Sequence, residues 1–216
     1  MIAKEIIAIV IGYLLGSIPS AYIAASWVKG KDIRQLGGGN IGGLNAFREV
    51  GVGAGIAVAV ADIGKGVVAV AIAYWLLAVP QLFVLLAGLA AIVGHMWMFT
   101  LKFSGGKGMG ATVGILCILM PIYGYWQGLL IFLGIYLIVI IITRNVALSS
   151  AVVLFSLPFI AWLGVESGFF SPFFIVWSVI TGIIISLKFL PTAKAALAKA
   201  ESKRDFIFDR WHRDKR

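Results

Sequence analysis

Residues 109–142, MGATVGILCILMPIYGYWQGLLIFLGIYLIVIII, decide the fold class because they contain no charged side chain. A single helix over this stretch would be about 50 Å long at ~1.5 Å per residue, whereas the hydrocarbon core of a bilayer is about 30 Å thick. Met120-Pro121 and Gly124 offer a break near the middle, since the residue before a proline disfavours helical backbone. The stretch therefore predicts two membrane spans.

The other apolar runs extend the same pattern along the chain. They cover residues 6–28, 52–79, 82–101, 146–164 and 169–187. The chain is 61% hydrophobic and 12% charged, whereas soluble domains have roughly 45–50% apolar and 25% charged residues. The first run is longer than the apolar region of a signal peptide, which favours a retained span. We therefore expect an all-α integral membrane protein with seven transmembrane helices.

Charge placement predicts the orientation of these spans. Seven crossings put the loops 29–51, 102–108 and 143–145 on the same side as the C-terminal tail. Of the 18 Lys and Arg residues, all but Lys4 and Lys65 fall in these loops or in the stretch from Lys188 to the end of the tail. The positive-inside rule then places the C-terminus in the cytoplasm and the N-terminus outside. Cys117 is the single cysteine, which excludes an internal disulfide and argues against a structural metal site.

The sequence predicts a membrane domain over residues 1–191 and a basic cytosolic tail over 192–216. Thr192 follows Pro191 and is a candidate N-cap for a basic helix. Aromatic and aliphatic residues among the cations, namely Phe206, Ile207, Phe208 and Trp211, would let such a helix lie on the inner leaflet. A disordered tail is the alternative. Nucleic-acid binding is not needed to explain the net charge of +9, because the predicted topology already accounts for it.

Two glycine-rich cytosolic loops carry the chemistry. They read GGGNIGG at residues 37–43 and KFSGGKG at residues 102–108. Glycines leave backbone N–H groups open to a ligand and lysines add positive charge, a combination that suits phosphate. Membrane spans flank the first loop, and Lys107 is not followed by Ser or Thr, which excludes a dinucleotide fold and a nucleotide P-loop. Tight turns and close helix packing are the alternative use of these glycines.

The order of several short motifs resembles the bacterial acyl-phosphate:glycerol-3-phosphate acyltransferases. The motifs are Leu15-Gly16-Ser17-Ile18-Pro19, Gly39-Asn40-Ile41-Gly42 with Asn45 and Arg48, Asp62 with Lys65-Gly66, and Gly94-His95-Met96 leading into Lys102-Phe103 and Gly105-Gly106-Lys107-Gly108. The resemblance implies a multi-pass enzyme of the bacterial inner membrane. Its substrates would be acyl phosphate and glycerol 3-phosphate, its products lysophosphatidic acid and phosphate, and it would need no metal, nucleotide or acyl carrier. The sequence leaves the oligomeric state open, and a monomer is compatible with it.

The resemblance and the residue chemistry together predict a site. The expected catalytic residues are His95, Lys107 and Asn45. The expected substrate-binding residues are Gly39, Asn40, Gly42, Arg48, Lys102, Gly105, Gly106 and Gly108. Lys107 and its glycines would bind the acyl phosphate, and Arg48 with Lys102 the phosphate of glycerol 3-phosphate, although these two assignments could be exchanged. His95 would act as a base or a phosphate donor, or else would be a neutral histidine bonded between helices.

Departures from the family pattern motivate a second hypothesis. Gly38 and Leu44 stand where the family usually has Ser and Thr, and residues 186–191, SLKFLP, lack the usual His, Glu and Asn. A catalytically silent homologue that binds acyl phosphate or anionic lipid is therefore one alternative. A small transporter is another, because Asp62 and Lys65 lie inside a predicted span. Their spacing of three also favours an intramembrane ion pair.

Overall fold

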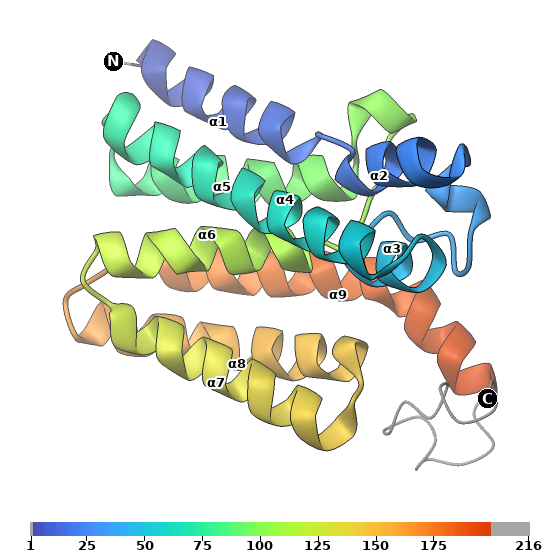
Figure 1. Cartoon of the computed structure of the whole chain (residues 1–216). Helices are drawn as coiled ribbons and strands as arrows, with labels where there is room; N and C mark the ends of the chain where they lie inside the picture. Colours follow the sequence, from blue (N-terminus) through green and yellow to red (C-terminus); the bar gives the residue numbers. More distant parts are fainter. Residues whose placement is uncertain (1, 200–216) are drawn as a thin grey trace. The chain divides into compact units, whose positions relative to one another are not determined.

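The computed structural model describes residues 2–199, and within them the chain is all-α (Figure 1). The helices are α1 (Ile2–Gly16), α2 (Ser20–Lys29), α3 (Gly43–Glu49), α4 (Val52–Ala71), α5 (Gln81–Met96), α6 (Met109–Ile122), α7 (Trp126–Thr143), α8 (Val146–Glu166) and α9 (Phe173–Lys199). Three short turns of helix, η1 (Ile33–Gln35), η2 (Ile72–Leu76) and η3 (Phe99–Leu101), lie between them.

Long apolar helices give the chain its membrane character. Among the described residues, five helical segments are long and apolar enough to cross a bilayer, namely Ile2–Lys29, Val52–Leu76, Trp126–Thr143, Val146–Glu166 and Phe173–Ala195. Two shorter apolar helices are α5 and α6. The predicted break in residues 109–142 is confirmed: α6 ends at Ile122, Gly124 has a φ of +81°, and α7 begins at Trp126.

The first apolar run, residues 6–28, holds a break that its uninterrupted apolar pattern does not predict. Helix α1 ends at Gly16, and α2 begins at Ser20 after the three residues Ser17, Ile18 and Pro19. Pro19 has no N–H to continue the helical hydrogen bonds, so the backbone turns before α2 starts. The carbonyl oxygen of Ile18 consequently remains available to groups outside α1.

The chain divides into two compact units, residues 1–122 and 123–216. In the first unit α1 packs along α5, and α4 packs along α6. Both contacts depend on glycine: a Cβ at Gly16 would collide with the carbonyl of Ala91, and one at Gly114 with the carbonyl of Ile63. Small residues allow membrane helices to approach closely, since van der Waals packing drives their association.

The second unit contains α7, α8 and α9, which pack in sequence order. Tyr125 closes one end, where it stacks on Phe169 and donates a hydrogen bond to the carbonyl of Ile160, 3.0 Å away. The predicted helix start at Thr192 is wrong, because α9 continues through Pro191 to Lys199. An internal proline removes one hydrogen bond, and the good helix formers on both sides maintain the helix. Residues 200–216, with Phe206, Ile207, Phe208 and Trp211, lie outside the described residues.

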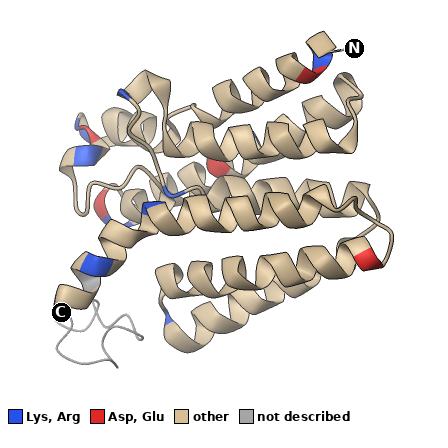
Figure 2. Cartoon of the chain, turned by 180° about the vertical axis from the view of Figure 1, so that it is seen from behind, with Lys and Arg blue, Asp and Glu red and all other residues tan. Residues whose placement is uncertain are grey.

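Most charged residues lie at helix ends within each unit (Figure 2), and Asp62 and Lys65 in the interior of α4 are exceptions. In the first unit, the cations of segments 29–48 and 102–107 lie at the end where α1 and α5 finish and α4 and α6 begin. Lys4 is near the opposite end, in the first turn of α1. In the second unit, Arg144 separates α7 from α8, and Glu166 ends α8. The helix order thus brings both glycine-rich loops to the same end of the first unit.

Candidate functional site

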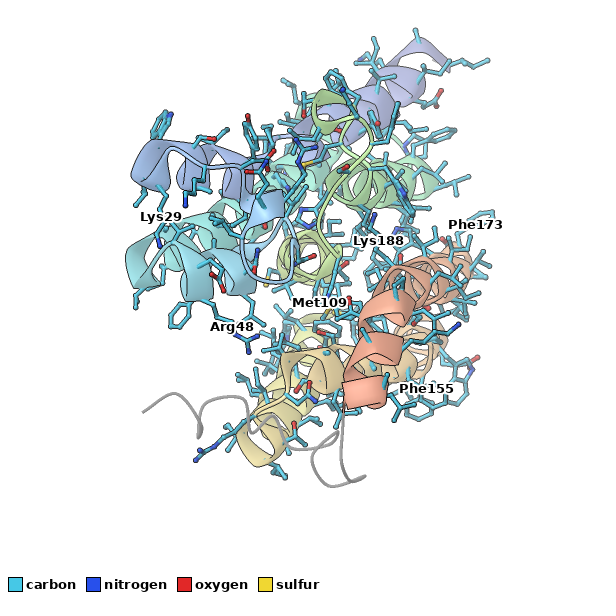
Figure 3. The ribbon with its side chains drawn as sticks, turned by 90° about the vertical axis from the view of Figure 1, so that its right-hand side faces the viewer. Lys29, Arg48, Met109, Phe155, Phe173 and Lys188 are labelled. Atoms are coloured by element: carbon cyan, nitrogen blue, oxygen red, sulfur yellow. The ribbon has the colours of Figure 1, made fainter. Side chains whose placement is uncertain are left out.

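The two glycine-rich loops meet at the C-terminal end of α5. The backbone N–H of Gly106 donates to the carbonyl of His95 at 2.9 Å. A Cβ added at Gly106 would collide with the His95 ring at Nε2 and would lie 2.6 Å from the carbonyl oxygen of Ile41. Ile41 belongs to the upstream loop, so Gly106 joins that loop to α5. Figure 3 looks toward this end of the first unit, with Arg48 on α3 and Met109 at the start of α6 labelled.

Protein packing accounts for several of the predicted substrate-binding glycines. A Cβ at Gly105 would collide with the carbonyls of His95 and Met96, so this glycine packs against the end of α5. Gly39 and Gly108 have left-handed φ values of +69° and +87°, which side chains disfavour. Gly42 is the extended N-cap residue of α3. The N–H groups of Gly39 and Gly42 already donate to the carbonyls of Leu36 and Asn40, so the expectation that these two N–H groups are open to a ligand is wrong. Contacts between the N–H groups of Gly105 and Gly108 and phosphate stay a prediction.

Two cations from different loops share this region. Lys107 is half-buried, and Arg48 is an exposed residue in the last turn of α3. Burial lowers the pKa of the Lys107 amine below its ordinary range, and the nearby positive charge of Arg48 lowers it further. A phosphate group that binds here would interact favourably with both positive charges.

The two asparagines lie in the upstream loop and in the helix that follows it. Asn45 on α3 is buried, and its Nδ2 donates to the carbonyls of Leu36 at 3.0 Å and Ile33 at 3.5 Å. The side chain therefore braces the turn that precedes the loop, and a direct contact with substrate stays a prediction. Asn40 is half-buried beside Gly42, where its Nδ2 would lie 3.0 Å from an added Cβ.

Lys102 is an exposed residue on a constrained turn. Lys102 and Phe103 both have left-handed φ values, +55° and +58°, which are uncommon for residues with side chains. The turn is closed by the N–H of Phe103, which donates to the carbonyl of Met98 at 2.9 Å. The strained turn fixes the direction in which the backbone at Lys102 presents its side chain. Whether the Lys102 amine reaches phosphate stays a prediction.

A surface ion pair that sequence reasoning missed links the two loops further. Arg34 contacts Asp32 at 2.6 Å, and its Nη1 donates to the carbonyl of Leu101 at 3.5 Å. Hydrogen bonds from Arg34 lower the pKa of the Asp32 carboxyl. In the sequence, Asp32 and Arg34 do not indicate a functional site, because oppositely charged neighbours are common on protein surfaces. Their contact with Leu101 becomes visible only in the folded chain.

His95 lies beneath the glycine loop and faces an acidic residue. The imidazole is buried, with Nδ1 3.5 Å from Oδ1 of Asp62 and Nε2 directed at Gly106. The predicted ion pair between Asp62 and Lys65 is confirmed at 2.9 Å. Ser20, which the sequence analysis did not select, donates to the same Asp62 oxygen at 2.6 Å. His95 thus lies between helices, where its Nδ1 approaches Asp62 without a hydrogen bond, and its use as a base stays a prediction.

The match to known proteins covers nearly the whole chain. A family model described as glycerol-3-phosphate acyltransferase matches residues 6–199. The chain belongs to the glycerol-3-phosphate acyltransferase family. Glycerol-3-phosphate acyltransferase 1 of Dehalococcoides mccartyi is 46% identical over 95% of this chain and 97% of its own length. Glycerol-3-phosphate acyltransferase 2 of Moorella thermoacetica is 36% identical over 92% of this chain and 96% of its own length.

Solved structures of the glycerol-3-phosphate acyltransferase family support the fold. The crystal structure of PlsY, described as an integral membrane glycerol 3-phosphate acyltransferase in its glycerol 3-phosphate form, superposes with a TM-score of 0.78. It is 25% identical to this chain, with 90% of this chain and 92% of PlsY covered. The family resemblance expected from the sequence motifs is therefore confirmed, as is an integral membrane fold.

Proposed function

We propose that this membrane acyltransferase of phospholipid synthesis takes its acyl group from an acyl phosphate. The acceptor is the sn-1 hydroxyl of glycerol 3-phosphate, and the products are lysophosphatidic acid and inorganic phosphate. The observation that carries the proposal is the junction of the two loops, where Gly106 packs against Ile41 and the charge of Arg48 acts on Lys107. Both proposed substrates carry phosphate, and the junction offers a cation from each loop.

The reaction requires positioning and charge stabilisation more than a protein nucleophile. An acyl phosphate is a mixed anhydride with a good leaving group, so the bound hydroxyl can attack the acyl carbon directly. The new ester bond forms as the bond between the acyl carbon and the phosphate oxygen breaks, and phosphate leaves with the electron pair. The hydroxyl proton passes to Nε2 of His95, which is directed at the loop. Cations at the leaving phosphate stabilise the developing charge.

The two cations divide the two phosphates between them. Lys107 with Gly105, Gly106 and Gly108 binds the phosphate of the donor, where negative charge grows during transfer. Arg48, assisted by Lys102, binds glycerol 3-phosphate, since a guanidinium can hold two phosphate oxygens at once. Gly39, Asn40 and Gly42 of the upstream loop complete the proposed phosphate-binding site. Asn45 supports the catalytic geometry by holding the turn at Leu36.

The same proposal places the chain in a bacterial inner membrane with seven crossings, the N-terminus outside and the C-terminus in the cytoplasm. The cations at the loop end of the first unit support this orientation. Helices α5 and α6 would be the shortest crossings, with lengths of about 24 Å and about 21 Å at ~1.5 Å per residue. A bilayer can thin locally around spans shorter than its hydrocarbon core.

Cysteine labelling tests the orientation. The single native cysteine is replaced first, as Cys117→Ala, and new cysteines are introduced as Gly38→Cys in the upstream loop and Ser167→Cys after α8. In intact cells, a membrane-impermeant maleimide should label Ser167→Cys alone, and in inverted membrane vesicles it should label Gly38→Cys alone. Labelling of both positions from the same side would refute the predicted orientation.

A product assay tests the reaction. Purified protein in lipid is given an acyl phosphate with and without glycerol 3-phosphate, and phosphate and lysophosphatidic acid are measured. The parent should form both products in equal amounts only when glycerol 3-phosphate is present, and acyl-CoA should not replace the donor. Lys107→Ala and Asn45→Ala should each reduce turnover at least tenfold. Product formation from acyl-CoA, or parental rates in both variants, would overturn the donor assignment or the site assignment, respectively.

A further inference from the structure

We infer that Arg34, held by Asp32, is a positioning residue that fixes the turn carrying Lys102 for the binding of glycerol 3-phosphate. The inference rests on the proposed function, in which Lys102 assists Arg48 at the phosphate of this substrate. Nη1 of Arg34 donates to the carbonyl of Leu101, the residue directly before Lys102, at 3.5 Å. Arg34 therefore acts on substrate binding through the backbone of that turn.

A fork of hydrogen bonds to Asp32 fixes the guanidinium of Arg34. Nε lies 3.1 Å from Oδ1 and 2.9 Å from Oδ2, and Nη2 donates to Oδ2 at 2.6 Å. Oδ1 also accepts a hydrogen bond from the backbone N–H of Arg34 at 2.9 Å, which caps η1. A planar guanidinium held at several N–H groups has little rotational freedom, so Asp32 sets the direction of Nη1 toward Leu101.

The exposure of this ion pair favours a geometric role over a large contribution to stability. The side chains of Arg34 and Asp32 are 38% and 20% exposed. Exposed ion pairs contribute little to the free energy of folding, because water screens the charges and two side chains lose freedom. Removal of the Arg34 side chain should therefore change the position of the turn more than it changes the unfolding temperature.

The turn that receives Nη1 is strained and depends on its neighbours. Lys102 and Phe103 both have left-handed φ values, a conformation that costs free energy and persists where surrounding contacts impose it. The carbonyl oxygen of Leu101 accepts from the N–H of Ser104 at 3.1 Å, which closes the turn, and from Arg34, which ties the turn to η1. Without the second bond the strained turn should relax, and the side chain of Lys102 would then point elsewhere.

The short helix η1 holds the upstream loop at the same time. The carbonyl oxygen of Arg34 would lie 3.0 Å from a Cβ at Gly39, so this glycine packs against η1. Nδ2 of Asn45 donates to the carbonyl of Ile33 at 3.5 Å. Ile33 and Leu101 are buried in one apolar cluster, at 0% and 7% exposure. The helix η1 thus contacts both loops and relates their positions to each other.

The ordering of Lys102 should appear in substrate affinity. This side chain is exposed and has a flexible four-carbon stem, so the amine reaches a phosphate reliably only if the backbone points it there. Order that exists before binding need not be imposed by the substrate, which strengthens binding. A displaced turn should therefore raise the KM for glycerol 3-phosphate and leave kcat nearly unchanged, whereas partial unfolding would lower the apparent kcat at an unchanged KM.

A double-mutant cycle tests whether Arg34 acts through Lys102. Arg34→Gln should raise the KM for glycerol 3-phosphate about fivefold, with kcat within about twofold of the parent. Lys102→Met should raise this KM about tenfold, and the double variant should match Lys102→Met, because residues that act through one contact are not additive. A parental KM in either single variant, or a double variant in which the two effects multiply, would overturn the inference.

Two further variants separate geometry from charge. Lys29→Gln removes a positive charge from the exposed end of α2, and its KM should stay within about twofold of the parent. Arg34→Lys keeps the charge, but one ammonium cannot reproduce a planar fork that reaches both Asp32 and Leu101, so its KM should rise about threefold. This variant preserves the test if Arg34→Gln fails to fold. A KM raised equally in Lys29→Gln, or a parental KM in Arg34→Lys, would show that charge alone is responsible and would refute the positioning role.

Calorimetry distinguishes this inference from the proposed function. The Kd for glycerol 3-phosphate is measured by titration of the purified full chain in detergent, without an acyl donor, for the parent and every variant. If the parent forms no lysophosphatidic acid from acyl phosphate, the proposed function fails while the Kd ratios still decide the role of Arg34. If the parent is active and the Kd effects of Arg34→Gln and Lys102→Met multiply, the proposed function stands and the inference falls. A parent that does not bind glycerol 3-phosphate would overturn both.

Discussion

Replacing Gly106 by alanine tests whether the junction of the two loops supports catalysis. The new methyl group would lie 2.6 Å from the Ile41 carbonyl oxygen, whereas ordinary van der Waals contact begins near 3.4 Å. The upstream loop would therefore have to move by about 0.8 Å, and the His95 ring would also have to turn away. Overpacking of this kind costs roughly 1–3 kcal/mol in a well-packed protein.

The effect on activity should exceed the effect on stability. A displacement of about 1 Å at reacting groups can reduce a rate by about 10²-fold. We therefore expect Gly106→Ala to lower kcat/KM for glycerol 3-phosphate by about 10- to 100-fold in the phosphate-release assay, at a temperature where the variant is still folded by thermal unfolding in detergent.

Gly38→Ala is the matched control for this substitution. Gly38 lies in the upstream loop, and an added Cβ would meet nothing within 4 Å. Its kcat/KM should stay within twofold of the parent, as expected for exposed sites. Parental activity in Gly106→Ala would refute the claim that the junction positions the reacting groups. An equal loss of kcat/KM in both variants would show that a general change in loop flexibility is enough to reduce activity, and it would also count against a specific role of the junction.

Three further substitutions follow from the geometry. Because the folded-state pKa of Lys107 is below the ordinary 10.5, the unfolded chain binds more protons between the two values and stability rises with pH there. Lys107→Met should abolish turnover yet raise the unfolding temperature near pH 7, a gain that shrinks as the pH rises toward 10.5. Lys31→Met should change neither turnover nor the unfolding temperature. Lys107→Arg should keep substrate affinity to higher pH than the parent, measured as KM against pH. Gly16→Ala should lower the unfolding temperature by pushing α1 off Ala91, at about 1–3 kcal/mol, whereas Gly64→Ala, with open space around it, should not.

Much of the fold could be predicted because the bilayer imposes a simple length rule. A run without charges that exceeds one crossing must break, and Pro121 with Gly124 supplied the place. The break at Ser17–Pro19 was harder to foresee, since residues 6–28 are of a suitable length for one span. Its cause lies in groups far along the chain: the Ile18 carbonyl and the Ser20 hydroxyl bind the pair on α4. No local pattern contains that information.

The candidate site likewise has features that the sequence predicts and features that depend on groups far apart in the chain. Topology alone placed both loops on one side, and the contact between Gly106 and Ile41 agrees with it. The direction of each side chain could not be read from the sequence. Asn45 turns its amide toward Leu36, and Asp62 on α4 lies 3.5 Å from Nδ1 of His95 on α5. Polar residues in apolar spans signalled that a buried network exists, while the partners depend on helix rotation and packing.

The enclosure of the buried pair also weighs against the transport hypothesis. Asp62 and Lys65 are 4% and 6% exposed and are held by Ser20 and the Ile18 carbonyl. Ionisable residues on a transport path must exchange partners with a passing ion or substrate. A pair fixed by several hydrogen bonds favours a structural or positioning role.

Two departures from the family pattern, at Gly38 and Leu44, fall on positions that the loop architecture does not depend on, and the third, at residues 186–191, lies on α9 in the second unit. Gly38 has open space around it, and Leu44 is 41% exposed, whereas the buried Ile41 and Asn45 form the junction and the brace. Acyl transfer from an acyl phosphate needs charge stabilisation on the leaving phosphate above all, and Lys107 and Arg48 retain that capacity. A hydroxyl that contacts substrate phosphate contributes a charge-assisted hydrogen bond of about 1.5–3 kcal/mol. The absence of one such hydroxyl would therefore weaken substrate binding by about 10- to 150-fold, which the product assay on the parent protein measures directly.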